Sequence, residues 1–223
     1  MDIVVVGFAG RSGSQKICGE EPYRSALLKR YSKRFLAGLF DGSEGQNAPE
    51  PFWQTGNQGG FGSAEPSGTC EGPGAFEKLS GPEAFLKSIG VPEEHRKGCE
   101  EGGIFAALWA LLHENRLGGA FCQREIPIRQ QTVEICEQYG LNPYRLSGKD
   151  CAICLCEEGG KLVQKAAEQG LPAAVIGFTE KGPAIRRLDC EETAYLRRPE
   201  PDELYRLFPG RSGSGRSGAE TET

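Results

Sequence analysis

Apolar residues recur along the chain in short unbroken runs, and these predict strands. The first run, at residues 2–8, is dominated by β-branched side chains and is typical of a strand buried on both faces of a sheet. Similar runs predict strands at residues 120–126, 151–156 and 172–178, and a final hairpin at residues 185–188 and 193–196.

Between these runs the apolar positions follow a helical period. Pro22 and Ser32 each stand where a helix is expected to begin, because Pro fits the first turn and Ser caps it. Further helices are predicted over residues 81–90, 104–112, 129–139 and 161–169, closed by Gly90, Gly140 and Gly170 where a C-cap glycine is needed. Residues 104–112 are apolar on nearly every side, which indicates a helix buried all round or packed against another domain. Strands alternating with helices predict a single α/β domain, a mixed sheet packed with helices in layers.

Two segments carry no such period. Residues 41–75 hold nine Gly and four Pro, and we expect a Gly/Pro-rich flexible insertion over residues 41–80, with a ligand-ordered lid as the alternative. Residues 209–223 predict a low-complexity, disordered tail. The domain is therefore expected in two parts, residues 1–40 and 81–208.

Composition and charge narrow the class of protein. The chain of 223 residues has 26 basic and 31 acidic residues, so no global positive field favours nucleic acid. No apolar run approaches the roughly 20 residues that cross a bilayer, and the first residues lack the features of a signal peptide. We expect a cytoplasmic protein without nucleic-acid or membrane partners. The nine Cys then favour free buried thiols over a disulfide framework.

A glycine-rich turn at residues 10–14 lies between a predicted strand and a predicted helix. Backbone amides at a helix start suit an anion, and Arg11 and Ser12 could add donors. An ordinary tight turn is the alternative, because the segment is neither a Walker sequence nor a dinucleotide fingerprint and recurs in the tail at residues 210–214.

Other candidate groups carry weaker chemistry. Cys151 and Cys154 have CxxC spacing, but on a strand their side chains diverge, which favours structural cysteines. His95 and His113 have flanking sequences that suit surface or capping roles. Glu100 and Glu101 before a Gly-Gly pair could complement a helix dipole or face a ligand. We predict no catalytic residue and no metal ligand.

Four segments in one order resemble a known family. They are residues 101–109 (EGGIFAALW), 126–136 (IPIRQQTVEIC), 141–144 (LNPY) and 170–177 (GLPAAVIG). The chain resembles the C-terminal domain of the AIR synthase-related proteins, the superfamily of aminoimidazole ribonucleotide synthase and HypE. The resemblance implies a PurM-like C-terminal domain that follows an N-terminal ATP-binding domain, with the active site between the two. ATP and Mg are implied through that other domain, which this chain is expected to lack, and no cofactor is expected for this chain alone.

The chain departs from the family pattern near the expected cleft. Gly98 and Glu100 stand where relatives carry an Asp and a Thr, and residues 148–150 replace a Ser-Ser-Gly type turn. We therefore expect a diverged, solitary domain without independent catalysis. The alternatives are one half of a split enzyme, completed by a separate ATP-binding domain or by self-association, and a phosphate-binding or regulatory module. The predicted phosphate- or substrate-binding residues are Gly10, Arg11, Ser12, Gly13, Glu101, Gly102 and Gly103.

Overall fold

The computed structural model describes residues 1–40, 81–188 and 193–209. The predicted insertion at residues 41–80 lies outside the described residues. So does the predicted tail, apart from its first residue.

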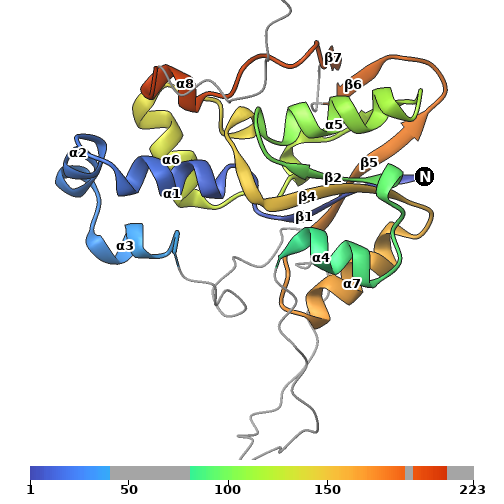
Figure 1. Ribbon diagram of the computed structural model, residues 1–223, viewed down its shortest axis with the longest axis horizontal. Helices are drawn as coiled ribbons and strands as arrows, with labels where there is room; N and C mark the ends of the chain where they lie inside the picture. Colours follow the sequence, from blue (N-terminus) through green and yellow to red (C-terminus); the bar gives the residue numbers. More distant parts are fainter. Residues whose placement is uncertain (41–80, 189–192, 210–223) are drawn as a thin grey trace, which may run out of the picture.

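A seven-stranded mixed sheet forms the centre of the domain (Figure 1). Its strand order is β2-β4-β1-β5-β3-β6-β7, and every neighbouring pair is antiparallel except β3 and β6. The strands are β1 (Asp2–Gly7), β2 (Arg96–Cys99), β3 (Gly118–Phe121), β4 (Gly148–Cys156), β5 (Ala173–Glu180), β6 (Ile185–Leu188) and β7 (Thr193–Tyr195).

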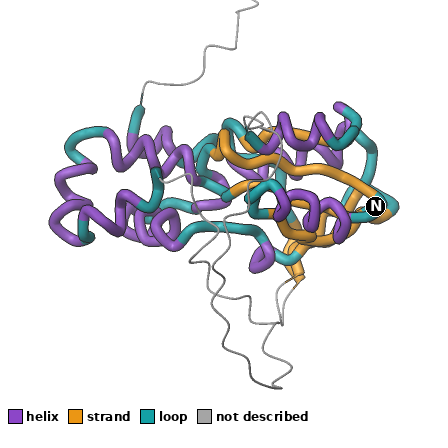
Figure 2. Tube along the Cα trace, turned by 90° about the horizontal axis from the view of Figure 1, so that it is seen from below, coloured by secondary structure: helices purple, strands orange, loops and turns teal. Residues whose placement is uncertain are grey.

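Helices cover both faces of the sheet and build a lobe at one end of it. Helix α5 lies on one face and α4 and α7 on the other, while α1, α2, α3, α6 and α8 form the lobe (Figures 1 and 2). The helices are α1 (Arg11–Gly19), α2 (Tyr23–Arg30), α3 (Lys33–Ala37), α4 (Pro82–Ser88), α5 (Gly103–Glu114), α6 (Gln130–Tyr139), α7 (Gly159–Glu168) and α8 (Leu204–Leu207). None of these described helices has the length and apolar character that a membrane span requires.

Alternate side chains of β1 pack into two different core clusters, one on each face of the sheet. Ile3 and Val5 point into the cluster under α5, and Val4 and Val6 into the cluster under α4 and α7. All four side chains are fully buried, as the unbroken apolar run predicts. A third cluster fills the helical lobe, where Ile17 of α1 meets the apolar side of α6. The predicted α/β fold, with a mixed sheet packed by helices, is confirmed.

Several predicted boundaries are wrong for local reasons. The strand expected at residues 120–126 begins at Gly118 and ends at Phe121, since the polar segment Gln123–Glu125 forms a 3₁₀ turn instead. The expected buried strand at residues 172–178 leaves Val175 and Phe178 exposed, because α7 does not cover their side of the sheet completely. Strand β2 and helix α8 are too short to show a period and are not predicted.

Candidate functional site

The Gly10 turn is the start of α1. The helix begins at Arg11, inside the segment expected to be a turn, and Gly10 is its N-cap residue in the left-handed region. A Cβ on Gly10 would lie 2.6 Å from the carbonyl oxygen of Pro143, and one on Gly13 would lie 2.5 Å from Cγ of Leu146. Both glycines therefore allow α1 to approach residues 143–149 closely, independently of any ligand.

The polar groups of this turn are engaged within the chain. The N–H of Gly13 donates to the Ser147 carbonyl at 2.8 Å. The Ser12 hydroxyl donates to the same carbonyl at 3.1 Å and accepts from the Lys149 N–H at 2.8 Å. Arg11 donates from Nε to the Leu39 carbonyl at 2.9 Å. Phosphate binding by these residues stays a prediction, and a phosphate there would compete with four existing bonds.

The Glu101–Gly103 turn packs against the same segment. A Cβ on Gly103 would lie 2.6 Å from the carbonyl oxygen of Leu146 and 2.7 Å from that of Tyr144. The N–H of Gly102 donates to Oδ2 of Asp202 at 2.9 Å. Residues 143–149 thus bring together two turns that are about 90 positions apart in sequence.

A cavity of about 220 Å³ opens between these elements. Its lining is mixed in charge, with carboxylates, two ammonium groups and a phenol facing one space. Tyr205 donates its hydroxyl to Oε1 of Glu101 at 2.6 Å, and the ammonium of Lys16 lies 5.4 Å from the ring centre of Phe208. The lining residues are Lys16, Glu100, Glu101, Ser147, Lys149, Asp202, Leu204, Tyr205 and Phe208. We take this cavity as the candidate functional site and call it the interloop cavity.

Asp202 is the most unusual group in the interloop cavity. It is 3% exposed and accepts N–H bonds from Gly102 and Leu204, both at 2.9 Å. Burial raises the pKa of the Asp202 carboxyl, and these two backbone bonds oppose the shift. A carboxyl of this kind can hold or release a proton nearer to neutral pH than an exposed one.

Of the predicted site residues, only Glu101 lines the interloop cavity, and Gly102 reaches it through Asp202. Lys16, Lys149, Asp202 and Tyr205 were not predicted as site residues. Two sequence features fall in this region, namely the acidic pair Glu100 and Glu101 and the departure from the family turn at residues 148–150. Nothing in the local sequence pairs Asp202 with a loop 100 positions earlier.

The cysteines and histidines of the described residues form no further cluster that we assign as a site. Cys151 faces the α5 side of the sheet and Cys154 the α4 and α7 side, which confirms the predicted divergence. The ring of His113 stacks on Trp109 with centres 4.7 Å apart, and His95 ends a 3₁₀ turn. Within the described ranges, no three His, Cys, Asp or Glu side chains are placed to hold a metal ion.

Comparison with solved structures identifies the class of fold. No family model matches the sequence, and a search of curated proteins finds no match either. The fold is nevertheless the PurM-like α/β fold, and it matches solved structures of HypE, a hydrogenase maturation protein. HypE of E. coli aligns with a TM-score of 0.57 at 13% identity, over 92% of this chain and 52% of that chain.

Two further HypE structures agree. A HypE structure in complex with ATP aligns with a TM-score of 0.52 at 14% identity, over 90% of this chain and 51% of that chain. A structure of a HypE–HypF complex aligns with a TM-score of 0.52 at 16% identity, over 89% of this chain and 53% of that chain. The chain therefore spans about half the length of the HypE chains it matches. The resemblance to the AIR synthase-related proteins is confirmed at the level of the fold.

Proposed function

We propose that this chain is a diverged AIR synthase-like C-terminal domain that forms one wall of a ligand cleft and does not catalyse ATP-dependent chemistry by itself. One observation carries the proposal: nearly the whole chain aligns with about half of a HypE chain. An ATP-binding domain, from another polypeptide or from further sequence of the same protein, would supply the other wall.

The interloop cavity is the part of the surface that suits such a wall. It gathers groups that bind and orient a polar ligand, with Lys16 and Lys149 as cations and Glu101 as an acceptor held by Tyr205. Asp202 adds a buried carboxyl whose raised pKa suits proton exchange with a bound group. ATP and Mg would be held by the other domain, and no step through them is derived for these residues.

The surroundings of Gly98 support the loss of independent catalysis. Relatives are expected to carry an Asp at this position, whereas here Oε1 of Glu83 from α4, the end of a flexible side chain, occupies the space where a Cβ would lie. The place of the expected side chain is therefore taken by a carboxylate from a different element. Because the family chemistry depends on side chains positioned at this loop and Gly98 supplies none, the ancestral reaction is disfavoured.

The test compares the chain alone with the chain joined to an ATP-binding partner. The genomic neighbourhood of the reading frame identifies the candidate partner, and both proteins are purified separately. We expect no ATP hydrolysis by the chain alone and saturable binding of the partner. ATP turnover by the chain alone, lost in Glu101→Gln but kept in the exposed control Glu94→Gln, would overturn the proposal. ATP turnover that requires both proteins, and that Glu101→Gln abolishes while Glu94→Gln does not, would instead favour the split-enzyme alternative.

The second candidate, a phosphate-binding module, is favoured by the two lysines of the interloop cavity. The same preparation is titrated calorimetrically with inorganic phosphate and pyrophosphate. Lys149→Gln is the informative variant, because Lys149 is exposed, whereas Arg11 bonds to Leu39 and its removal would disturb the lobe. Saturable heat that Lys149→Gln weakens, and that Lys181→Gln leaves unchanged, supports the module; absence of saturable heat removes it.

A further inference from the structure

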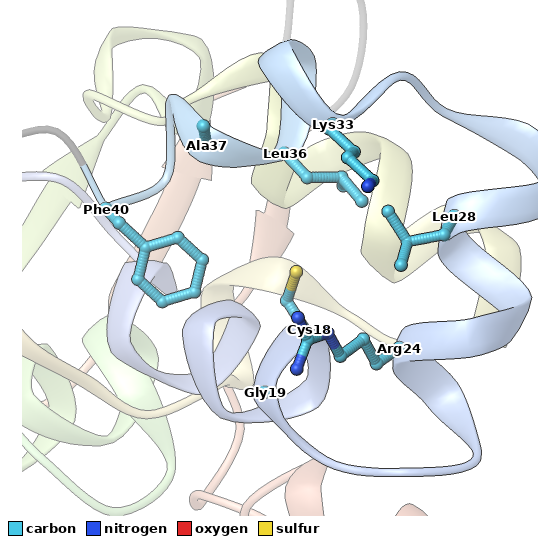
Figure 3. A pocket seen from close by; sticks show the side chains of 8 residues that line it. All are labelled: Cys18, Gly19, Arg24, Leu28, Lys33, Leu36, Ala37 and Phe40. Carbon is cyan, nitrogen blue, oxygen red and sulfur yellow. The ribbon is translucent and has the colours of Figure 1, made fainter.

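A second cavity, of about 420 Å³, lies in the helical lobe between α1, α2 and α3 (Figure 3). It shares no lining residue with the interloop cavity. In Figure 3 the side chains of Cys18, Leu28 and Phe40 point toward one another across the hollow. Its lining residues are Cys18, Gly19, Arg24, Leu28, Lys33, Leu36, Ala37 and Phe40. We call it the lobe cavity.

The walls of the lobe cavity are apolar and open to solvent. Leu36 and Cys18 form a buried floor, only 4% and 7% exposed. Leu28 and Phe40 form the sides and are 38% and 54% exposed, although both are large apolar side chains. Small-molecule pockets have volumes of about 300–1,000 Å³ and predominantly apolar walls, so the lobe cavity has the size and lining of a ligand site.

The rim of the lobe cavity is cationic. Arg24 and Lys33 are exposed at its edge, and within the described residues neither forms an ion pair. The surrounding sequence has the same bias. Residues 11–40 contain seven basic and two acidic side chains, a formal charge of +5, while the remaining 19 basic and 29 acidic residues give −10. The lobe is thus a local positive field on an acidic protein.

An apolar hollow with two unpaired cations at its rim complements a molecule with an apolar body and an anionic head. We propose that the lobe cavity binds a free medium-chain fatty acid. The acyl chain packs against Leu28, Leu36 and Phe40, and the carboxylate pairs with Arg24 and Lys33. This site is distinct from the proposed cleft, because the two cavities share no lining residue, although α1 contributes to both, and the ligand needs no second domain.

The first test is calorimetric titration of the purified full chain with decanoate. We expect one saturable site per chain, weaker binding of hexanoate because it buries less apolar surface, and weaker binding of decanol because it lacks the charge. Arg24→Gln and Lys33→Gln should each weaken decanoate binding at least fivefold. Lys29→Gln is the matched control, since Lys29 is exposed on the same helix and does not line the cavity. All three are surface changes, and equal thermal midpoints establish that they fold alike.

The second test places the ligand inside the lobe cavity. The thiol of Cys18 lines the cavity, so decanoate should slow its alkylation by iodoacetamide at least threefold, read by peptide mass spectrometry. Cys122, which lies outside the cavity, should react at an unchanged rate and serves as the internal control. Burial raises the pKa of the Cys18 thiol and the nearby Arg24 charge lowers it, so rates are compared only within one variant.

Several results would overturn the proposal. They are the absence of saturable decanoate binding, equal affinities for decanol and decanoate, an unprotected Cys18 at saturation, and loss of monomeric protein as Leu28 and Phe40 become covered by a second copy. Binding to anionic lipid vesicles without binding to free decanoate would also overturn it, in favour of a membrane-surface role.

Discussion

The packing of Gly103 against residues 143–149 gives a prediction that can be worked through quantitatively. Gly103 adopts φ = +65°, and the Cβ of an alanine there would meet two backbone carbonyl oxygens at 2.6 and 2.7 Å. Backbone oxygens cannot rotate away as a flexible side chain can, so the turn or the segment must move. Gly140 is a matched control, because it has φ = +61° and no atom within 4 Å of an added Cβ.

The two substitutions separate backbone strain from collision. An L-residue in the left-handed region costs about 1–2 kcal/mol, and both Gly103→Ala and Gly140→Ala carry this cost. Overpacking adds about 1–3 kcal/mol, and only Gly103→Ala carries that. We therefore expect Gly103→Ala to lower the free energy of unfolding by about 1–3 kcal/mol more than Gly140→Ala does. In a protein of this size each kcal/mol lowers the melting temperature by about 2–4 °C.

Urea unfolding followed by circular dichroism measures the difference. With equal dependence of the unfolding free energy on urea, the midpoint of Gly103→Ala should lie clearly below that of Gly140→Ala. If the two midpoints coincide, close packing against residues 143–149 is not the reason why position 103 is a glycine. A role in ligand contact then becomes the better explanation of Gly103.

Two further predictions address the interloop cavity and the sheet. Burial raises the pKa of Asp202 in the folded protein above its ordinary value of about 3.9. Protonation of Asp202 therefore stabilises the folded state. This stabilisation is complete at a pH below about 3.9 and is lost as the pH rises through the raised pKa. The stability of the native protein relative to Asp202→Asn should therefore fall as pH increases above about 4, and a pH-independent difference between pH 3 and 7 would contradict this. Phe121→Ala removes a fully buried side chain and should lower the free energy of unfolding by about 3–5 kcal/mol. Phe178 on the neighbouring strand is 48% exposed, so Phe178→Ala should lower it far less. Similar losses in thermal unfolding would mean that Phe178 is covered in solution.

Local signals in the sequence determined most elements. Ser32 caps α3 by accepting the Phe35 N–H at 3.1 Å, and Gly140 closes α6 in the left-handed conformation, both as predicted. The unbroken run in β1 specified a strand buried on both faces. These features depend on a residue and its near neighbours, so they can be recognised along the chain alone.

The tertiary structure alone decided what those elements meet. The apolar pattern of α5 shows that this helix is buried. It does not show that the first turns of α5 and α1 both pack against residues 143–149. Asp202 reaches Gly102 across 100 positions, and the lobe cavity arises where three separate helices leave a hollow. Gly10 and Gly103 lie against backbone carbonyl oxygens, and Gly13 lies against the Leu146 side chain. Their sequence context predicts anion binding, which stays a prediction, and it does not indicate this close packing. Periodicity records which side of an element avoids water, and it contains no information about the partner that covers that side.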